Sequence, residues 1–175
     1  MSLEQKINNL ETDLHIMGTL VLDSLVGAVR ALEDKDTLKA SEVMDKDDEI
    51  DDAYMKIDQD WFELMATEQP VASDLRLSTS ILQASLHLER LGDLSVYLGK
   101  TTHEIHDLPI PESLHKIVVE MGDMVIDMAS SALESLKNRD AELALSTARK
   151  DELINSLYNK MLNEVPNISG NKDLY

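Results

Sequence analysis

The sequence has little of what strands, tight turns and covalent cross-links require. Its 175 residues include no cysteine, six glycines and four prolines, and aromatic side chains make up 3% of the chain. The absence of cysteine excludes disulfides and thiolate metal sites. The scarcity of glycine, proline and aromatic residues disfavours a β-rich fold and favours long helices. Hydrophobic residues still reach 43%, which is enough to build a buried core.

Positive charge is also scarce. The chain has 16 Lys and Arg against 34 Asp and Glu, a net charge of −18. Such a surface repels phosphate backbones and anionic lipid headgroups, so we expect no nucleic-acid partner, and it favours cations and basic protein surfaces. The sequence has no signal-peptide pattern and no run of about 18 apolar residues. We therefore expect a cytoplasmic protein without direct membrane insertion.

Apolar residues recur at three- and four-residue steps along most of the chain, which is the pattern of helices with one buried face. In the first helix this row is Ile7, Leu10, Leu14, Met17, Val21, Leu25, Ala28 and Leu32. A linker with two prolines, 107–111, separates two groups of helices, and the segment from Glu164 onward is expected to be a loop. The predicted helices span residues 3–33, 37–67, 70–104, 112–138 and 141–163.

The second group of helices repeats the first. A shift of 104 residues lays 121–164 over 17–60 without a gap, and thirteen of these 44 positions are identical. Shared helical patterning would match apolar residues, but it would not readily match Gly18, Asp23 and Asp47 with Gly122, Asp127 and Asp151. We infer a duplicated antiparallel three-helix unit. The first bundle would occupy 1–106 and the second repeat 112–175, with a sixth helix beginning near Asn171 and left incomplete.

Two acidic residues lie on one face of the helix predicted over 70–104. Glu89 and Asp93 are four residues apart, so their side chains are neighbours on the helix surface. They continue a row that also contains Leu75, Leu82, Leu86 and Tyr97. Carboxylates about 6 Å apart repel each other by up to ~3 kcal/mol at an effective dielectric of 20. Their position in an apolar row therefore calls for a compensating charge.

The helix predicted over 37–67 offers a matching set. Asp47 and Asp51 are also four residues apart, and Asp58 continues the same line. If the two helices pack antiparallel, four or five carboxylates converge, and a cation would relieve their repulsion. Oxygen ligands suit Mg²⁺, Ca²⁺, Mn²⁺ or oxidised iron, and Zn²⁺ tolerates them. The alternative is a solvated acidic face, because such pairs arise often in so acidic a chain.

Two blocks carry a resemblance to a known family. Gln69–Arg76 reads QPVASDLR and Leu88–Asp93 reads LERLGD. At this separation the two blocks resemble the PhoU family of phosphate-regulatory proteins, and the similarity extends over nearly the whole chain. The resemblance implies an all-α fold of tandem antiparallel three-helix bundles, of which the second lacks its last helix in this chain.

The resemblance also implies a function and a metal site. It implies a negative regulator of phosphate uptake and signalling, acting between the ATPase subunit of a phosphate ABC transporter and a sensor histidine kinase. It implies a metal ion or cluster, iron or zinc, with Mg or Mn as further possibilities. Carried over by position, the ligands are Asp47, Asp51, Glu89 and Asp93; Asp58 and Asp151 are weaker candidates.

The second repeat departs from the family pattern. The counterpart of Asp51 is Asn155, and the counterparts of Glu89 and Asp93 would fall beyond Tyr175. A second metal cluster therefore cannot form from these residues alone. Apolar helix faces without a third helix predict self-association or a swapped partner helix, and we expect a homodimer.

Three classes of function remain open at this point. The leading prediction is a regulatory adaptor that is not an enzyme. The second is a carboxylate-metal hydrolase or oxidase on a helical bundle, which is disfavoured by the lack of histidine ligands and of a positioned base. The third is a metal-free structural bundle that only dimerises.

Overall fold

The computed structural model describes residues 1–169, and within these residues the secondary structure is entirely α-helical. This confirms the predicted all-α class. The sixth helix expected near Asn171 lies outside the described residues. The helices are α1 (Leu3–Asp34), α2 (Thr37–Asp45), α3 (Asp47–Glu68), α4 (Ala72–Ile105), α5 (Glu112–Asn138), α6 (Ala141–Arg149) and α7 (Asp151–Ser169).

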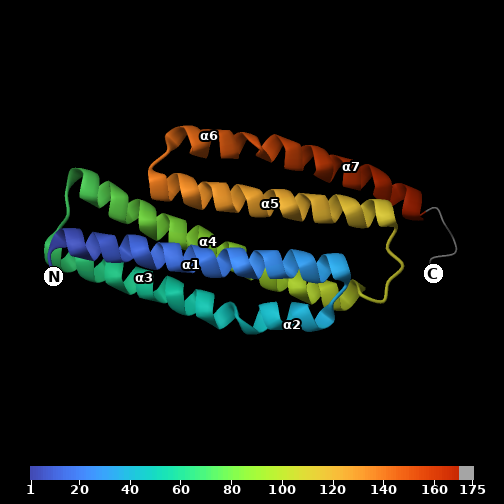
Figure 1. Cartoon of the computed structure of the whole chain (residues 1–175), viewed down its shortest axis with the longest axis horizontal. Helices are drawn as coiled ribbons and strands as arrows, with labels where there is room; N and C mark the ends of the chain where they lie inside the picture. Colours follow the sequence, from blue (N-terminus) through green and yellow to red (C-terminus); the bar gives the residue numbers. More distant parts are fainter. Residues whose placement is uncertain (170–175) are drawn as a thin grey trace.

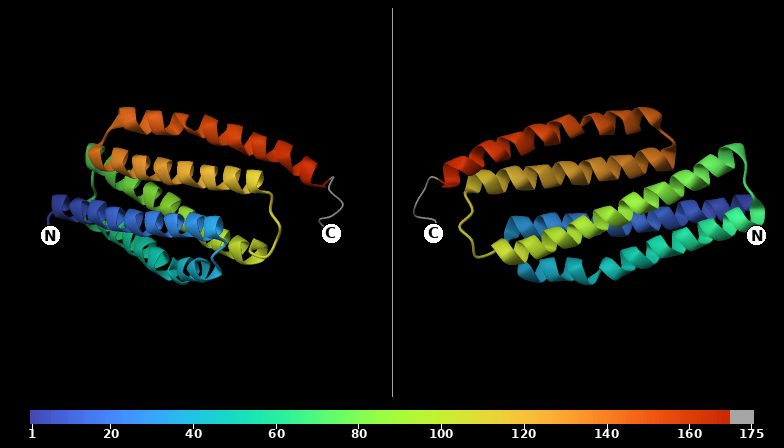
Figure 2. Two further views of the ribbon diagram at one scale, coloured as in Figure 1. Left: turned by 45° about the vertical axis from the view of Figure 1, so that its right-hand side comes forward. Right: turned by 180° about the vertical axis from the view of Figure 1, so that it is seen from behind.

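Helix α1 lies in the middle of an elongated bundle (Figure 1). It packs against α2, α3 and α4 on one side and against α5 on the other, and α6 and α7 pack on α5. The two further views in Figure 2 show the same order of layers, with α4 running at an angle to α1. The first repeat is therefore a closed bundle, and the second adds a layer to it through α5.

The sequence of α1 explains its central place. Every member of the predicted apolar row of α1 is buried, and Met17 and Val21 are completely so. An 18-residue stretch of α1 has a mean hydropathy of 1.4, apolar enough by length and composition to span a membrane, although no long run of purely apolar residues is present. Half of that stretch is buried inside the protein. The apolar composition of α1 is thus accounted for by its position as the core helix.

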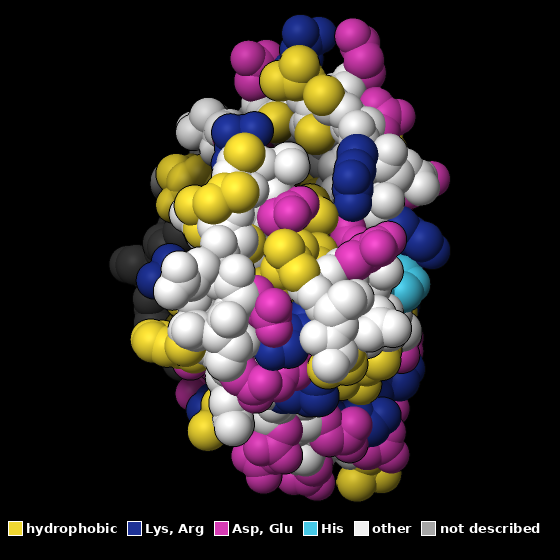
Figure 3. Space-filling model, turned by 90° about the vertical axis from the view of Figure 1, so that its left-hand side faces the viewer, with side chains coloured by type: hydrophobic (Ala, Val, Ile, Leu, Met, Phe, Trp, Pro, Cys, Tyr) yellow, Lys and Arg dark blue, Asp and Glu magenta, His cyan; other side chains and the backbone are white. Residues whose placement is uncertain are grey.

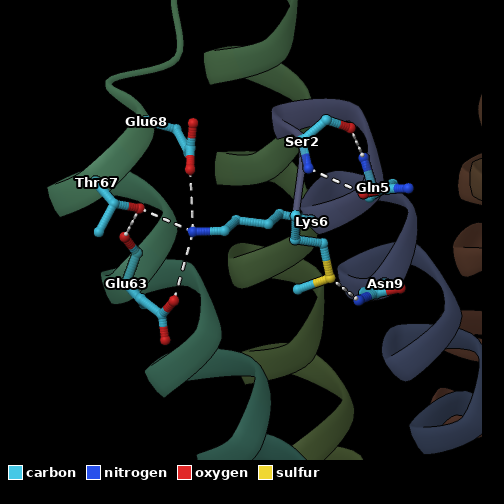
Figure 4. A network of polar contacts seen from close by, with 8 residues as sticks. Ser2, Gln5, Lys6, Asn9, Glu63, Thr67 and Glu68 are labelled. Atoms are coloured by element: carbon cyan, nitrogen blue, oxygen red, sulfur yellow. Dashed lines mark hydrogen bonds and ion pairs between the residues drawn. The ribbon is translucent and has the colours of Figure 1, made fainter.

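The first turns of α1 are fixed to the end of α3 by a lysine (Figure 4). The Nζ atom of Lys6 donates to Oγ1 of Thr67 at 2.9 Å and lies 3.1 Å from Oε1 of Glu68 and 3.4 Å from Oε1 of Glu63. The adjacent acids raise the pKa of Lys6, the hydrogen-bonded Glu68 most strongly. Ser2 and Gln5 form a reciprocal capping box at the same end.

Small residues make up most of the buried face of α4, beside the two core residues Ile81 and Leu88. Ser78 and Ser85 are followed at seven-residue steps by Gly92 and Gly99, and all four are buried. The buried hydroxyl groups donate back to carbonyl groups one turn earlier, for example Ser85 Oγ to Leu82 O at 2.8 Å. Each hydroxyl is therefore satisfied within its own helix, and the helix surface stays flat. This lets the backbone of α4 lie close to its neighbours, of which α1 is the most extensive.

This small-residue face corrects the predicted orientation of α4. Leu75 is 42% exposed, Leu86 38% and Tyr97 69%, so most of the row that contains Glu89 and Asp93 is on the surface, and only Leu82 and Glu89 are partly buried. The prediction that these acids continue a buried apolar row is wrong. Leucines occur on several sides of α4, and the three helices packed against it cover the side that carries serine and glycine.

The duplication is visible in the backbone. Lys35 and Arg139, 104 residues apart, both end a helix in the left-handed region, with φ of 54° and ψ of 34° and 36°. The residues that follow them, Asp36 and Asp140, both cap the next helix with their carboxylates. The shared backbone geometry at matched positions supports a common origin of the two units.

The helices predicted over 37–67 and 141–163 are each broken in the same place. At Lys46 the chain makes i to i+3 hydrogen bonds, from Lys46 N to Val43 O and from Glu49 N to Lys46 O, and Lys150 repeats the pattern. Acidic residues follow each break, Asp47 to Glu49 in α3 and Asp151 with Glu152 in α7. Acids in a first turn are stabilised by the helix dipole, so they favour a new helix start there. The loop predicted from Glu164 is also wrong, since α7 continues to Ser169.

The two repeats meet along α1 and α5, where a glycine of each repeat receives an apolar side chain of the other. A Cβ atom at Gly18 would lie 2.8 Å from the side chain of Leu133, and one at Gly122 would lie 2.8 Å from Val29. Since Gly122 and Leu133 are the repeat counterparts of Gly18 and Val29, both contacts are the same contact made twice. The repeats therefore pack by an approximate two-fold relation.

Polar contacts hold this interface mainly at one end. Near Val29, Arg30 Nη2 donates to Asp123 Oδ1 at 2.6 Å, and Lys35 Nζ donates to Leu108 O at 2.9 Å. The other end has the ion pair between Arg139 Nη2 and Glu11 Oε1, at 3.2 Å.

Apolar side chains of the second repeat are less covered than their counterparts. Ala28 and Ala40 are completely buried, whereas Ala132 and Ala144 are exposed, and Leu145 and Leu153 are more than half exposed. In the first repeat, the two alanines belong to the buried core, whereas the counterparts of Leu145 and Leu153 are the polar residues Ser41 and Glu49. Self-association through this face stays a prediction.

We predict that Ser85→Leu destabilises the protein by about 1–3 kcal/mol, because the larger side chain must separate closely packed helices. Urea unfolding followed by circular dichroism measures the change. Ser80→Leu, on the exposed side of the same helix, is the matched control and should change the stability by less than about 0.5 kcal/mol. Equal effects of the two substitutions would contradict close packing along the serine face.

Candidate functional site

A helix contact places the two predicted acid pairs opposite each other. Ile50 lies between Asp47 and Asp51 on α3, and Gly92 lies between Glu89 and Asp93 on α4. A Cβ atom at Gly92 would be only 3.1 Å from Cδ1 of Ile50 and 3.2 Å from its Cγ2. The glycine thus lets α3 approach α4 at the level of the acids. The segment Leu88–Asp93 therefore contains both the acids of α4 and the glycine that brings them close to α3.

The four carboxylates differ in exposure but act on one another. Asp47 and Glu89 are partly buried, whereas Asp51 and Asp93 are exposed. Burial raises the pKa of Asp47, and the charges of Asp51 and Asp93 raise it further. Burial likewise raises the pKa of Glu89, followed by the charges of Asp93 and Asp51. The acid pairs therefore lie on the same side of the bundle, within electrostatic range.

Basic side chains compensate this cluster only in part. Lys100 lowers the pKa of Asp47 and Arg90 lowers that of Glu89, in each case against larger opposing effects. Among the ion pairs of residues 1–164, none involves any of the four carboxylates. Excess negative charge remains, which is the condition that a cation would relieve.

The donor atoms of the cluster suit a metal ion, but the side chains do not converge on one point. Four carboxylates supply the oxygen ligands that hard cations prefer. In the described part of the chain, however, no three His, Asp or Glu side chains converge closely enough to hold one ion. A bound ion would have to draw the exposed side chains of Asp51 and Asp93 toward Asp47 and Glu89.

The two weaker candidates lie outside this cluster. Asp58 is partly buried on α3, and it is not among the charges that act most strongly on Asp47 or Glu89. In α7, Nδ2 of Asn155 donates to Oδ2 of Asp151 at 2.9 Å. The amide that replaces the second carboxylate thus satisfies the first. The second repeat therefore has one carboxylate with a hydrogen-bond donor where the first repeat has two carboxylates.

Sequence reasoning missed the contact that organises the site. The signal was present, because Gly92 interrupts a long helix and continues the seven-residue series of Ser78 and Ser85. Glycine inside a helix costs about 1 kcal/mol relative to alanine, so it indicates a close approach of another element.

The comparisons with known proteins agree with this architecture. The sequence model of the PhoU domain matches residues 14–102 and 118–174, one segment in each repeat. The chain belongs to the PhoU family. The resemblance found in the sequence is thereby confirmed.

Several PhoU relatives match over most of the chain. A protein of Clostridium acetobutylicum, named phosphate-specific transport system accessory protein PhoU homolog, is 32% identical over 94% of this chain and 75% of its own length. Relatives of the same name from Pseudomonas putida and Pseudomonas aeruginosa are also 32% identical. The chain spans 62% of the P. putida relative and 66% of the P. aeruginosa relative.

Solved PhoU structures share the fold. The crystal structure of PhoU from P. aeruginosa matches with a TM-score of 0.94 at 30% identity, covering 99% of this chain and 83% of that one. The phosphate transport system regulatory protein PhoU from Streptococcus pneumoniae matches with a TM-score of 0.87 at 28% identity, covering 98% of this chain and 80% of that one. The tandem-repeat PhoU fold is therefore shown for the residues present.

We predict that Asp47→Asn stabilises the metal-free protein at pH 7 by about 0.5 kcal/mol, the scale of exposed charge pairs. A carboxyl group whose pKa is raised on folding does not lower the free energy of unfolding while it is protonated in both the folded and the unfolded protein. For Asp47, the destabilisation begins as the pH rises through the ordinary pKa of 3.8, and it is complete above the raised pKa of the folded protein. The stabilisation by Asp47→Asn should therefore be present at pH 7 and much smaller at pH 4.

Urea unfolding at the two pH values, with a chelator present, measures this difference. Asp52→Asn removes the charge of an exposed acid on the same helix and should have a smaller effect. Destabilisation by Asp47→Asn at pH 7 would contradict the repulsion between the acids.

Proposed function

We propose that this protein is an accessory regulator of a phosphate-specific transport system and is not itself an enzyme. The observation that carries the proposal is its membership of the PhoU family through both repeats, together with the names of its relatives. The relatives are longer than this chain, so the proposal concerns the activity to which these residues contribute. We place the protein in the cytoplasm, where a transporter ATPase and the catalytic part of a sensor kinase are accessible.

The partners in this proposal are the ATPase subunit of a phosphate ABC transporter and a sensor histidine kinase, and the regulation is negative. The charge distribution supports docking to basic surfaces. Helix α3 carries nine acidic residues and one lysine. Figure 3 shows Asp and Glu side chains crowded over the lower part of the end face, where α3 lies in Figure 1. Charge of one sign on one face steers a partner of the opposite sign.

We further propose that Asp47, Asp51, Glu89 and Asp93 bind a metal ion. The facing acid pairs and their uncompensated charge support this proposal. A bound cation would supply charge neutralisation between α3 and α4 and would stabilise the first bundle. Iron or zinc is the expectation from the family, and Mg²⁺ or Mn²⁺ suits the same ligands.

An enzymatic function is the second candidate class. A carboxylate-metal hydrolase or oxidase needs a positioned base or nucleophile beside the metal ligands. The groups that act on Asp47 and Glu89 are Asp, Lys and Arg side chains. This composition favours a regulatory or structural ion, and turnover of phosphoesters or dioxygen by the metal-loaded protein would reverse that order. A metal-free dimerisation bundle would lack any response to chelation.

We predict that Glu89→Gln combined with Asp93→Asn lowers the metal content of protein purified without chelators by at least about tenfold, because half of the ligand charge is lost. Elemental analysis measures the stoichiometry. Glu104→Gln with Asp107→Asn makes the same two changes at exposed positions near the end of α4 and serves as control. An unchanged metal content in the first variant would reject the assigned site.

We predict that the immobilised protein captures the transporter ATPase subunit and that Asp48→Lys with Asp52→Lys weakens capture about tenfold. The substitutions reverse charge on the solvent face of α3 and leave the four proposed ligands intact. Capture should also weaken between 0.05 and 0.5 M salt, since exposed charges are screened. Glu142→Lys with Glu152→Lys makes an equal charge change on α6 and α7, away from α3, and should leave capture unchanged. Capture that is absent, that is indifferent to salt and to the α3 variant, or that both variants weaken equally, would contradict docking through the acidic face of α3.

A further inference from the structure

Helix α3 exposes two apolar side chains beside the acidic cluster. Met55 is 66% exposed, and Phe62, the only phenylalanine of the chain, is 64% exposed. They follow Asp51 by four and eleven residues, so the three side chains share one face of the helix. The ring of Phe62 packs edge-on against Trp61, with 5.7 Å between the ring centroids. This contact holds the exposed ring in place.

Helix α4 exposes apolar side chains on the matching face. Leu86 lies seven residues before Asp93 and Tyr97 four residues after it, and both apolar side chains are on the surface. Helical spacing again puts the three side chains on one face. On another side of α4, Leu77 and Ile81 line a cavity of 390 Å³ among α1, α4 and α5, which we call the junction cavity. The exposed face is separate from it.

The contact between Ile50 and Gly92 fixes how the two exposed faces line up. The helices α3 and α4 run antiparallel, and α4 crosses in front of α1 in the right-hand view of Figure 2. Met55 is five residues after Ile50, and Leu86 is six residues before Gly92. Because each residue of a helix adds about 1.5 Å, Met55 and Leu86 lie at about the same level along the bundle.

Apolar side chains lie on both sides of the acids along this face. Phe62 is twelve residues beyond the contact on α3, and Tyr97 is five residues beyond it on α4, in the opposite direction. The two rings are therefore separated by about 25 Å along the bundle, the length of a helix of about 17 residues. We call this surface the α3–α4 stripe, and it consists of Met55, Phe62, Leu86 and Tyr97 with the acids between them, Asp51, Glu89 and Asp93.

Negative charge predominates on the two helices of the stripe. Helix α3 carries nine acids and one lysine, and α4 carries four acids and three Lys or Arg residues. The lysine of α3, Lys56, donates to Asp13 of α1 and to Asp60. On α4, Arg90 and Lys100 offset the acidic cluster only in part. A partner that covers the stripe must therefore supply positive charge as well as apolar area.

This combination selects among possible occupants. A second copy of the chain, packed through the same face about a two-fold axis, would place like charges opposite each other. An anionic lipid surface would be repelled. An amphipathic helix presents apolar side chains at three- and four-residue steps and can carry Lys or Arg beside them. Exposed apolar groups with a charged border are typical of a protein-interaction site.

We propose that the α3–α4 stripe docks a basic amphipathic helix of a partner protein. The apolar face of that helix covers the four exposed apolar side chains, and its Lys and Arg side chains lie against the acids between them. This inference rests on the proposed function for the identity of the partner, and it adds the mode of recognition. It also places the docking surface on α4 as well as on α3.

Three synthetic peptides of about 18 residues, the length of the stripe, test the proposal in the presence of a chelator. The first has leucines on one helical face and lysines on the other. The second replaces each leucine with glutamine, and the third replaces each lysine with glutamate. Binding is followed by the fluorescence of Trp61, the only tryptophan of the chain, which contacts Phe62.

We expect the leucine–lysine peptide to change the emission of Trp61. It should bind at least about tenfold more tightly than either other peptide, because only this peptide matches both the apolar groups and the charge of the stripe.

Variants test whether the peptide binds at the stripe. Leu86→Gln with Tyr97→Gln removes apolar area from α4 and leaves the acids and Trp61 in place. This variant should bind the leucine–lysine peptide about tenfold more weakly and the glutamine–lysine peptide as before. Leu145→Gln with Leu153→Gln makes two comparable changes at exposed positions of α6 and α7 and should bind as the parent protein does. Circular dichroism establishes that each variant is folded.

Several results would overturn the proposal. One is an unchanged emission of Trp61 up to millimolar leucine–lysine peptide, and another is equal affinity for the three peptides. A third is equal weakening in the α4 variant and in the α6–α7 variant.

Capture of the transporter ATPase separates this inference from the proposed function. Capture that is lost in Asp48→Lys with Asp52→Lys but kept in Leu86→Gln with Tyr97→Gln would reject helix docking on the stripe and leave the proposed function standing. Specific peptide binding without any capture of the ATPase would support the stripe as a helix-docking site and count against the proposed partner.

Discussion

The close approach of α4 to its neighbours is the constraint on which the rest of the structure depends. Serine and glycine at seven-residue steps remove the side chains that would otherwise keep helices apart. Gly92 then receives Ile50 of α3, and Gly99 lies against the backbone of Ala40 in α2. The orientation fixed by these contacts turns Glu89 and Asp93 toward Asp47 and Asp51. A packing requirement, rather than a binding requirement, thus sets the position of the acids.

The duplicated unit explains both the symmetry of the molecule and its division of roles. The helix ends at Lys35 and Arg139, the caps at Asp36 and Asp140, and the breaks at Lys46 and Lys150 are shared by both repeats. The side chains on this common backbone differ. Asp51 faces other acids, whereas Asn155 donates to Asp151. The first repeat has a cluster of mutually repelling carboxylates, and the second has a hydrogen-bonded Asp–Asn pair at the matching positions.

The acidic cluster and the junction cavity are physically distinct. The cluster lies at the contact of α3 with α4, within the first repeat, and is rich in uncompensated negative charge. The cavity lies between the repeats, among α1, α4 and α5, and half of its lining residues are leucine or isoleucine.

The sequence by itself determined the local structure. The apolar row of α1, the duplication at a shift of 104 residues and the acid pairs at four-residue spacing were all readable, because each depends on neighbours along one helix. Tertiary structure decided which side of α4 is buried. Leucines lie on several sides of that helix, and the side lined by Ser78, Ser85 and Gly92 is covered because it permits the closest packing with three other helices. The Ile50–Gly92 contact and the junction cavity likewise depend on how separate helices meet, which no single helix specifies.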